Sequence, residues 1–309
     1  MITEQNDMIV FESTNLRVVL DPNCGGKIRS IVSKRTGTEF LFQDPRAVFD
    51  QAKGFSYHDI SGIDECFPTV GQCNCSRGKF SGMSLGDHGL LWQQQWNTKI
   101  ENDAVVQWVN NTQFQFRFTR VCSFYDPCTL RLDYTIHNYG VEEIDYIYSA
   151  HPLFLANEHT RLELPQSVKQ LYITAAWGDL GLKENRWANI PFPLPDDLHG
   201  PYNHLRQTLM KAFTKAEQAA WIKLHRLDCG ESLEIKADTL QLPHMGILIS
   251  QGFDTLGDGD FKGRFLLGIE PTSGIGDDLE VCGRTGTVRQ LMPGQIMNFW
   301  ITIGVQQLQ

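Results

Sequence analysis

The sequence of 309 residues predicts an all-β protein, built as a large antiparallel β-sandwich. Short runs alternate apolar and polar residues, which is the pattern of strands with one buried and one more polar face. Clusters of Gly, Asn, Asp and Pro separate these runs at intervals that suit antiparallel meanders. Long amphipathic helical patterns are missing and helices do not alternate with strands, so we do not expect a doubly wound α/β fold.

The expected strands can be followed in order along the chain. The first two flank a turn that contains Pro22 and Gly26, and three more follow before residue 137. The second half of the chain holds shorter apolar runs and ends in an extended strand. The expected strands are residues 16–20, 27–32, 105–109, 114–121, 130–136, 220–224, 233–237, 246–249, 265–269 and 296–303.

Between these strands the sequence predicts two short helices, near residues 44–51 and 203–219. Residues 52–90 and 176–205 are expected to form long loops, and the prolines of the second loop exclude a central strand or a helix interior. Loops of this length on a sandwich usually form functional rims. No linker-like stretch interrupts the pattern, so we expect a single domain over residues 1–309.

Composition narrows the range of functions. The chain is 41% hydrophobic and carries a formal net charge of −9 at pH 7, which argues against the clustered lysines and arginines of a nucleic-acid surface. No apolar run approaches the roughly 18 residues that span a bilayer, and the N-terminus lacks the pattern of a secretory signal. We therefore expect a cytoplasmic protein, monomer or homodimer, whose partner is a small molecule rather than a nucleic acid or a membrane.

The eight cysteines are scattered along the chain and are expected to be reduced, mostly buried thiols. Cys73 and Cys75 are a close pair, with Cys66 and His88 nearby in sequence. Their C-x-C spacing lacks a second matching half, whereas structural zinc sites usually show a C-x₂₋₄-C spacing. We expect no metal site.

Two proton-handling side chains, His151 and Glu270, each end an apolar run and directly precede a proline. We expect the prolines to break the strands, and a strand end is a rigid place to hold an acid or a base. Partial desolvation would raise the pKa of Glu270 toward a value useful for a general base. The alternatives are a structural histidine and a surface glutamate at the end of a strand.

A second histidine, His88, lies in a turn between Asp87 and Gly89. Asp87 is placed to orient or charge-stabilise the imidazole, and Trp92 and Trp96 offer aromatic walls on which a sugar ring could stack, with core packing as the alternative for at least one of them. The alternative for the histidine is a plain polar turn. Together with His151 and Glu270, His88 suggests general acid–base chemistry on a small polar substrate.

Taken in order, these segments resemble the aldose 1-epimerase (galactose mutarotase) superfamily, and the likeness covers nearly the full chain. The segments that carry it are residues 25–31 (GGKIRSI), His88-Gly89, residues 149–154 (SAHPLF), residues 268–274 (GIEPTSG) and residues 291–295 (LMPGQ) before Phe299-Trp300.

This resemblance implies a galactose mutarotase-like supersandwich whose concave face binds an aldose. Glu270 would be the general base that removes the proton of the anomeric hydroxyl, and His151 the general acid that protonates the ring oxygen. His88 would assist at the ring oxygen or an adjacent hydroxyl. Ring opening, rotation about the C1–C2 bond and reclosure then give the other anomer, and such proton transfers need no cofactor.

Residues 61–68 (SGIDECFP) look like the GGIPxCFP region of hexose-6-phosphate mutarotases, but the arginines expected near it and after the His-Gly pair are missing. Asp64 and Glu65 place negative charge where a phosphate would need positive charge. We therefore expect an unphosphorylated sugar whose hydroxyls donate to Asp64 or Glu65, with a solvated acidic turn as the alternative. Arginines that could still supply a phosphate clamp are Arg77, Arg186, Arg206 and Arg264.

Three other functions stay open at this point. They are a hexose-6-phosphate mutarotase, a carbohydrate-binding protein without turnover, and a lyase or hydrolase on the same fold. A hydrolase would need two carboxylates about 5–5.5 Å or about 6.5–9.5 Å apart, and Glu65 and Glu270 are the candidates.

Overall fold

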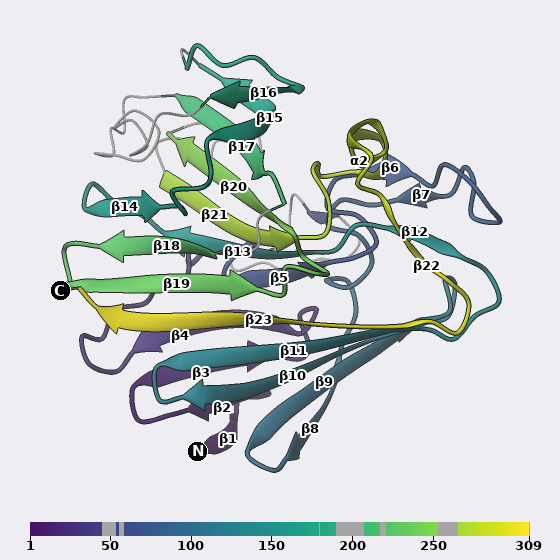
Figure 1. Cartoon of the computed structure of the whole chain (residues 1–309). Coiled ribbons are helices and arrows are strands. Elements are labelled where there is room, and N and C mark those ends of the chain that lie inside the picture. The colour runs from purple at the N-terminus through teal and green to yellow at the C-terminus, as the bar shows by residue number, and fades with distance from the viewer. Residues whose placement is uncertain are drawn as a thin grey trace.

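The computed structural model describes residues 1–44, 54–55, 59–178, 180–189, 207–216, 221–252 and 265–308. Two large antiparallel sheets dominate this part of the chain (Figure 1), which confirms the all-β sandwich expected from the alternating pattern. No helix in the described ranges is long and apolar enough to cross a membrane.

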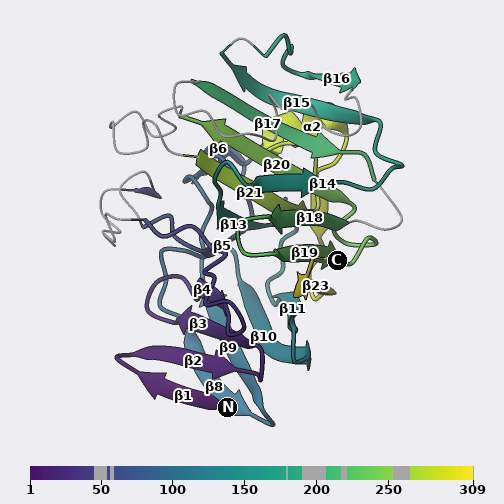
Figure 2. The ribbon, with the colours of Figure 1, turned by 90° about the vertical axis from the view of Figure 1, so that its left-hand side faces the viewer.

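The larger sheet has 11 strands and runs the length of the molecule (Figure 2). Its central strands are assembled from distant parts of the sequence, because β5, β13 and β21 lie side by side. In spatial order the strands are β1 (Ile2–Gln5), β2 (Met8–Glu12), β3 (Leu16–Asp21), β4 (Lys27–Ser33), β5 (Ile63–Cys66), β13 (Ser149–Leu155), β21 (Phe265–Thr272), β20 (His244–Gln251), β17 (Thr208–Thr214), β15 (Gln170–Trp177) and β16 (Arg186–Asn189).

The second sheet has eight strands and packs against one face of the first. In spatial order they are β14 (Thr160–Glu163), β18 (Trp221–Arg226), β19 (Glu231–Ala237), β23 (Ile296–Gln307), β11 (Thr129–Asn138), β10 (Phe116–Asp126), β9 (Ala104–Asn111) and β8 (Asn97–Glu101). The smaller elements are the pair β6 (Cys73–Asn74) with β7 (Ser84–Leu85), the pair β12 (Ile144–Tyr146) with β22 (Arg289–Leu291), and helix α2 (Leu279–Thr285).

The main core fills the space between the two large sheets. In β11 the residues Leu130, Leu132, Tyr134 and Ile136 are buried while their neighbours are partly exposed, as a strand with one core face requires. A second, smaller apolar cluster, which includes Phe55, Trp92 and Leu153, forms apart from this core.

One of the two expected helices is wrong, and the other lies outside the described residues from residue 45 onward. Within the expected helix at 203–219, Thr208–Thr214 form β17, a strand paired on both sides. Met, Lys and Ala favour helices locally, but pairing with β15 and β20 and burial of Ala212 and Phe213 override that preference.

The two expected loops also contain strands. Residues 52–90 include β5, which joins β4 to β13 in the larger sheet. Of residues 176–205, Trp177 ends β15 and Arg186–Asn189 form the edge strand β16, whereas the prolines lie outside the described residues. Neither strand shows a clear pattern, since one has four consecutive buried residues and the other is an exposed edge.

The prolines do not end the strands, contrary to the expectation. β13 continues past Pro152 to Leu155, and β21 continues past Pro271 to Thr272. The ladder between β13 and β21 lapses beside both prolines, between its paired positions Ser149–Thr272 and Leu153–Gly268. A proline has no backbone N–H, and in this gap the ladder has no paired positions that would need one.

Candidate active site

The candidate site is built on one row of residues across the larger sheet. Asp64 on β5 pairs with His151 on β13. Ser149 pairs with Thr272 and Leu153 with Gly268, so the same register sets His151 opposite Glu270 on β21. Directly opposed residues share one face of a sheet, so these three side chains point to the same side. β-pairing alone therefore brings His151 and Glu270 together.

His151 and Glu270 are in direct contact. The distance from His151 Nε2 to Glu270 Oε1 is 3.4 Å, and the Glu270 side chain is only 1% exposed. Oε1 accepts no hydrogen bond from any described residue. A buried carboxylate oxygen normally has a donor, so this atom is an acceptor open to a hydroxyl group.

Two glycines leave the space that this carboxylate occupies. A β-carbon at position 268 would lie 2.8 Å from Glu270 Oε1, and one at position 246 would lie 3.2 Å from Oε2. Gly246 pairs with Glu270 across the β20–β21 ladder, and Gly268 precedes it by two residues on the same face. The carboxylate therefore lies over two sheet positions, 246 and 268, that have no side chains.

Lys211 on β17 is a site residue that the sequence analysis missed. Its ammonium group donates to Glu270 Oε2 and lies 3.3 Å from Asp277 Oδ1 in the loop after β21. The stretch that contains Lys211 was expected to be a helix, so the sequence pattern did not place Lys211 on the face of a sheet. A lysine between apolar residues in a buried strand is the signal that could have found it.

This ion pair corrects the expected titration of Glu270. Burial pushes the pKa of the carboxyl upward, but the charges of His151 and Lys211 and the hydrogen bond from Lys211 outweigh it and lower the pKa. Glu270 is thus ionised at neutral pH. Asp277 behaves oppositely, because burial raises its pKa despite Lys211.

His151 is uncharged in the resting site. Burial lowers its pKa to about 4, and the opposing charge of Glu270 does not compensate because Lys211 and His88 act in the same direction as burial. An imidazolium with this pKa is a stronger proton donor than an ordinary imidazolium.

His88 reaches the same row from the turn between β7 and β8. Its ring meets the ring of His151 edge-on, with centroids 4.6 Å apart, and stacks on Phe55. Nδ1 lies 3.2 Å from Asp87 Oδ1. The Nδ1–H donates a hydrogen bond to this carboxylate, which leaves Nε2 unprotonated and able to accept a hydrogen bond. Among the described residues Nε2 has no hydrogen-bond partner.

The backbone of the turn is adapted to this placement. His88 has φ 58° and Gly89 φ 68°, two successive left-handed residues. The His88 N–H donates to the carbonyl of Val70, and the Val70 N–H donates to the carbonyl of Asp277 over 3.0 Å. Val70 therefore ties the turn of His88 to the loop of Asp277, and both loops are held over the same strand row.

Three other residues proposed from sequence, Asp64, Trp92 and Glu65, have different surroundings. Asp64 faces the site side and binds Lys27 Nζ at 2.6 Å. Trp92 is 1% exposed and donates from Nε1 to the carbonyl of Asp87, so it packs behind the His88 turn rather than presenting an open face. Glu65 lies outside the site.

Glu65 points to the opposite side of β5, into the core between the sheets. Its carboxylate accepts hydrogen bonds from Arg120, Tyr134 and Tyr148, and both ends of the Glu65–Arg120 ion pair are fully buried. Because Glu65 follows Asp64 in a strand, one of the two had to face away from the site. Burial raises the pKa of Glu65 despite Arg120. Its role is structural, and Glu65 and Glu270 do not form a hydrolase pair.

The positive charges near the row are committed to carboxylates. Lys27 and Lys211 are paired as described, and Arg29 binds Asp21 and Asp59. Of the four arginines considered for a phosphate, Arg77 binds Asp145, Arg186 is exposed on β16, and Arg206 and Arg264 lie outside the described residues. The described residues therefore offer a phosphate no unpaired cation at this row.

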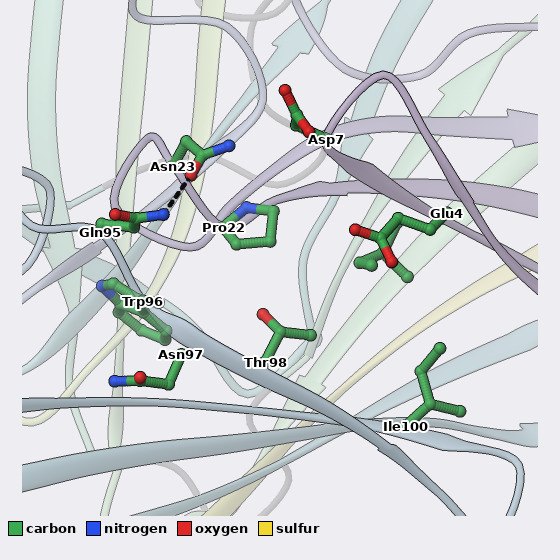
Figure 3. Close-up of a pocket in the computed structure, with 10 residues that line it drawn as sticks. Glu4, Asp7, Pro22, Asn23, Gln95, Trp96, Asn97, Thr98 and Ile100 are labelled. Carbon is green, nitrogen blue, oxygen red and sulfur yellow. Dashed lines mark hydrogen bonds between the residues drawn. The ribbon is translucent and has the colours of Figure 1, made fainter.

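Two other features lie apart from the row. A pocket of about 590 Å³ between the β1–β2 turn, the β3–β4 turn and β8 is lined by Trp96 but by none of His88, His151 and Glu270 (Figure 3). Polar residues that line it are Glu4, Asp7, Asn23, Gln95, Asn97 and Thr98. Within the described ranges there is no group of three or more His, Cys, Asp or Glu side chains arranged for a metal, and Cys73 and Cys75 are free thiols.

Comparisons with known proteins support the fold over almost the whole chain. Residues 1–134 match a family model described as a domain of unknown function, DUF5107. No match was found among curated proteins. Several solved structures are similar over nearly their full length, although their sequences are only distantly alike.

Three of these structures illustrate the likeness. A candidate aldose 1-epimerase from Escherichia coli K12 has 16% identity and a TM-score of 0.70 over 97% of this chain and 100% of its own. A galactose mutarotase-like protein from Lactobacillus casei has 15% identity and a TM-score of 0.71 with the same coverage. A galactose mutarotase related enzyme from Lactobacillus acidophilus has 17% identity and a TM-score of 0.69 over 98% and 99%. The chain therefore has the galactose mutarotase-like fold.

Proposed function

We propose that this protein is an aldose 1-epimerase that interconverts the α and β anomers of an unphosphorylated aldose. The observation that carries the proposal is the ionised, buried Glu270, whose Oε1 faces His151 and accepts no hydrogen bond from the described residues. General acid–base work needs one group that takes a proton and another that gives one, close together and out of bulk water.

In the proposed reaction Glu270 Oε1 takes the proton of the anomeric hydroxyl. His151 delivers a proton to the ring oxygen from its imidazolium form, which is scarce at pH 7 because the pKa is about 4. His88 Nε2 accepts a hydrogen bond from a neighbouring hydroxyl, since Asp87 holds the proton on Nδ1. Each proton transfer is worth roughly 10²–10⁴-fold in rate. The proposed sugar is unphosphorylated because Lys27, Arg29 and Lys211 are already paired.

This proposal is tested by adding purified protein to freshly dissolved α-D-glucose or α-D-galactose and following anomeric equilibration by polarimetry or saturation-transfer NMR. We expect equilibration faster than in buffer, and loss of that acceleration in Glu270→Gln. The matched control is Glu163→Gln on the other sheet, whose carboxylate also contacts a histidine, at 2.8 Å from His225 Nε2. That variant should keep the activity.

Other outcomes would favour the alternatives. Rates equal to buffer across a panel of aldoses and sugar phosphates, with binding still detected, would replace the proposal with a carbohydrate-binding protein. A marked preference for hexose 6-phosphates would replace it with the phosphate-specific activity, and would direct attention to arginines outside the described residues. We also propose that the protein acts in the cytoplasm without a cofactor.

A further inference from the structure

A further buried charge, Lys211, lies on the same face of the sheet two residues along the strand from this row, and its position is independent of His151. Lys211 lies on β17, two strands away from Glu270, and is 6% exposed. It approaches the carboxylate from the side opposite β13, across the space left by Gly246 and Gly268. Its ammonium group contacts Oε2, while His151 faces Oε1.

The two carboxylate oxygens therefore have different surroundings. Oε2 accepts a charge-assisted hydrogen bond, which holds the carboxylate plane and its charge in place. Oε1 has no hydrogen-bond donor among the described residues. Oε1 is therefore the oxygen with its full acceptor capacity open to a substrate proton, and it is next to His151.

Asp277 holds Lys211 from outside the sheet. Its Oδ1 is 3.3 Å from Lys211 Nζ, and its backbone carbonyl accepts the N–H of Val70. The next residue, Asp278, caps helix α2 by accepting the N–H of Val281. The loop that carries Asp277 is thus fixed at both its carbonyl and its C-terminal side, and the lysine has a defined resting place between two carboxylates.

We propose that Lys211, seated on Asp277, is a positioning residue that commits Oε2 of Glu270, turns Oε1 toward the substrate and keeps the base charged. This inference rests on the proposed epimerase function for its kinetic consequence, although its electrostatic part does not. Titratable groups that face Glu270 are His151 from β13, His88 from its turn, Lys211 from β17 and Asp277 from the loop, and His151 in addition faces Asp64 from β5 and lies near Asp87 beside His88. The facing positions on β20 are Gly246 and Leu248, which do not titrate.

Removing the lysine charge should change the titration of both partners in one direction. A unit charge within about 4–6 Å shifts a pKa by roughly 1–3 units. Lys211 lowers the pKa of Glu270 and that of His151, so loss of its charge should raise both. The conservative change Lys211→Arg keeps the charge and should restore the wild-type values.

The test uses the full chain labelled at histidine Cε1 and follows the His151 resonance against pH by NMR. The resonance is assigned by its loss in His151→Gln. We expect the midpoint to rise by one pH unit or more in Lys211→Met and in Lys211→Gln, and to stay near the wild-type value in Lys211→Arg. The control is Lys215→Met, just beyond the same strand, where the lysine contacts Gln170 instead.

In the active protein the maximum of the pH–rate profile should move to higher pH in Lys211→Met by a similar amount, with kcat falling more than KM changes. An unchanged His151 midpoint in a folded Lys211→Met or Lys211→Gln protein would overturn the inference, since a merely structural lysine would not move it. Failure of the proposed function gives a different result. The His151 midpoint would still differ between wild-type protein and Lys211→Met, but wild-type protein would not catalyse epimerisation.

Discussion

Gly268 and Glu270 are two residues apart on the same face of β21, and a β-carbon on the first would lie 2.8 Å from Oε1 of the second. Because position 268 has no side chain, the carboxylate of Glu270 can occupy the space above it. Side chains in a strand stand perpendicular to the sheet, so even a methyl group at position 268 would push the carboxylate away from His151.

We expect Gly268→Ala to lower epimerase activity by about 10-fold or more, because crowding of this kind costs roughly 1–3 kcal/mol and displaces the base. The measurement is kcat/KM for the preferred aldose, with circular dichroism to verify folding. Gly283→Ala in α2, where a β-carbon would meet no atom within 4 Å, serves as the control. Equal activity of the two variants would show that the space over Gly268 is not used.

The Asp87–His88 contact predicts a kinetic effect without direct substrate contact by Asp87. Asp87→Asn should lower kcat by about 10-fold or more, because an amide no longer selects the tautomer with a free Nε2. Burial acts to raise the pKa of Asp87, but the hydrogen bond and charge of His88 lower it overall, so the carboxylate is ionised at the working pH. Asp103→Asn in the exposed β8–β9 turn is the control, and the two variants are compared in steady-state kinetics.

Buried, neutral His151 predicts a pH dependence of stability. Its pKa is about 4 when folded and 6.5 ordinarily, so the unfolded chain binds more protons between these values. The free energy of unfolding should therefore fall as the pH is lowered from about 6.5 toward about 4, by about 3 kcal/mol from this group. Urea unfolding at several pH values measures the slope. His151→Gln should flatten it, whereas replacement of the exposed His159 should not.

The buried Glu65–Arg120 pair predicts a loss of stability without a loss of substrate affinity. Glu65→Gln leaves a buried guanidinium without its counter-charge and should destabilise the fold by about 3 kcal/mol. Glu101→Gln removes an exposed pair with Lys99 and should change little. Urea midpoints compare the two. A large rise in KM in folded Glu65→Gln would contradict this prediction, because it would mean that Glu65 contributes to substrate binding.

Much of the fold could be predicted because strands with one buried face carry a local signal. Each strand expected from alternation is present, among them residues 130–136 in β11 and 296–303 in β23. Two of the strands that were not expected, β5 and β17, have no such signal. β5 is buried on both faces, and β17 has the residue preferences of a helix, so only their sheet neighbours define them.

For the site, the sequence by itself identified His88, His151 and Glu270 as side chains suited to acid–base chemistry. It offered Asp64 or Glu65 as an acceptor for sugar hydroxyls in an expected loop, whereas the two are neighbours in a strand and point to opposite faces. Which of the two faces the site depended on the pairing of β5 with β13. A lysine among apolar residues was a local hint of Lys211, but the contact of Lys211 and Asp277 with Glu270 could not be found from sequence, since it depends on the register of distant strands and on a loop. Alternation is local and readable in the chain, whereas cross-strand pairing joins residues far apart in sequence and is decided by tertiary packing.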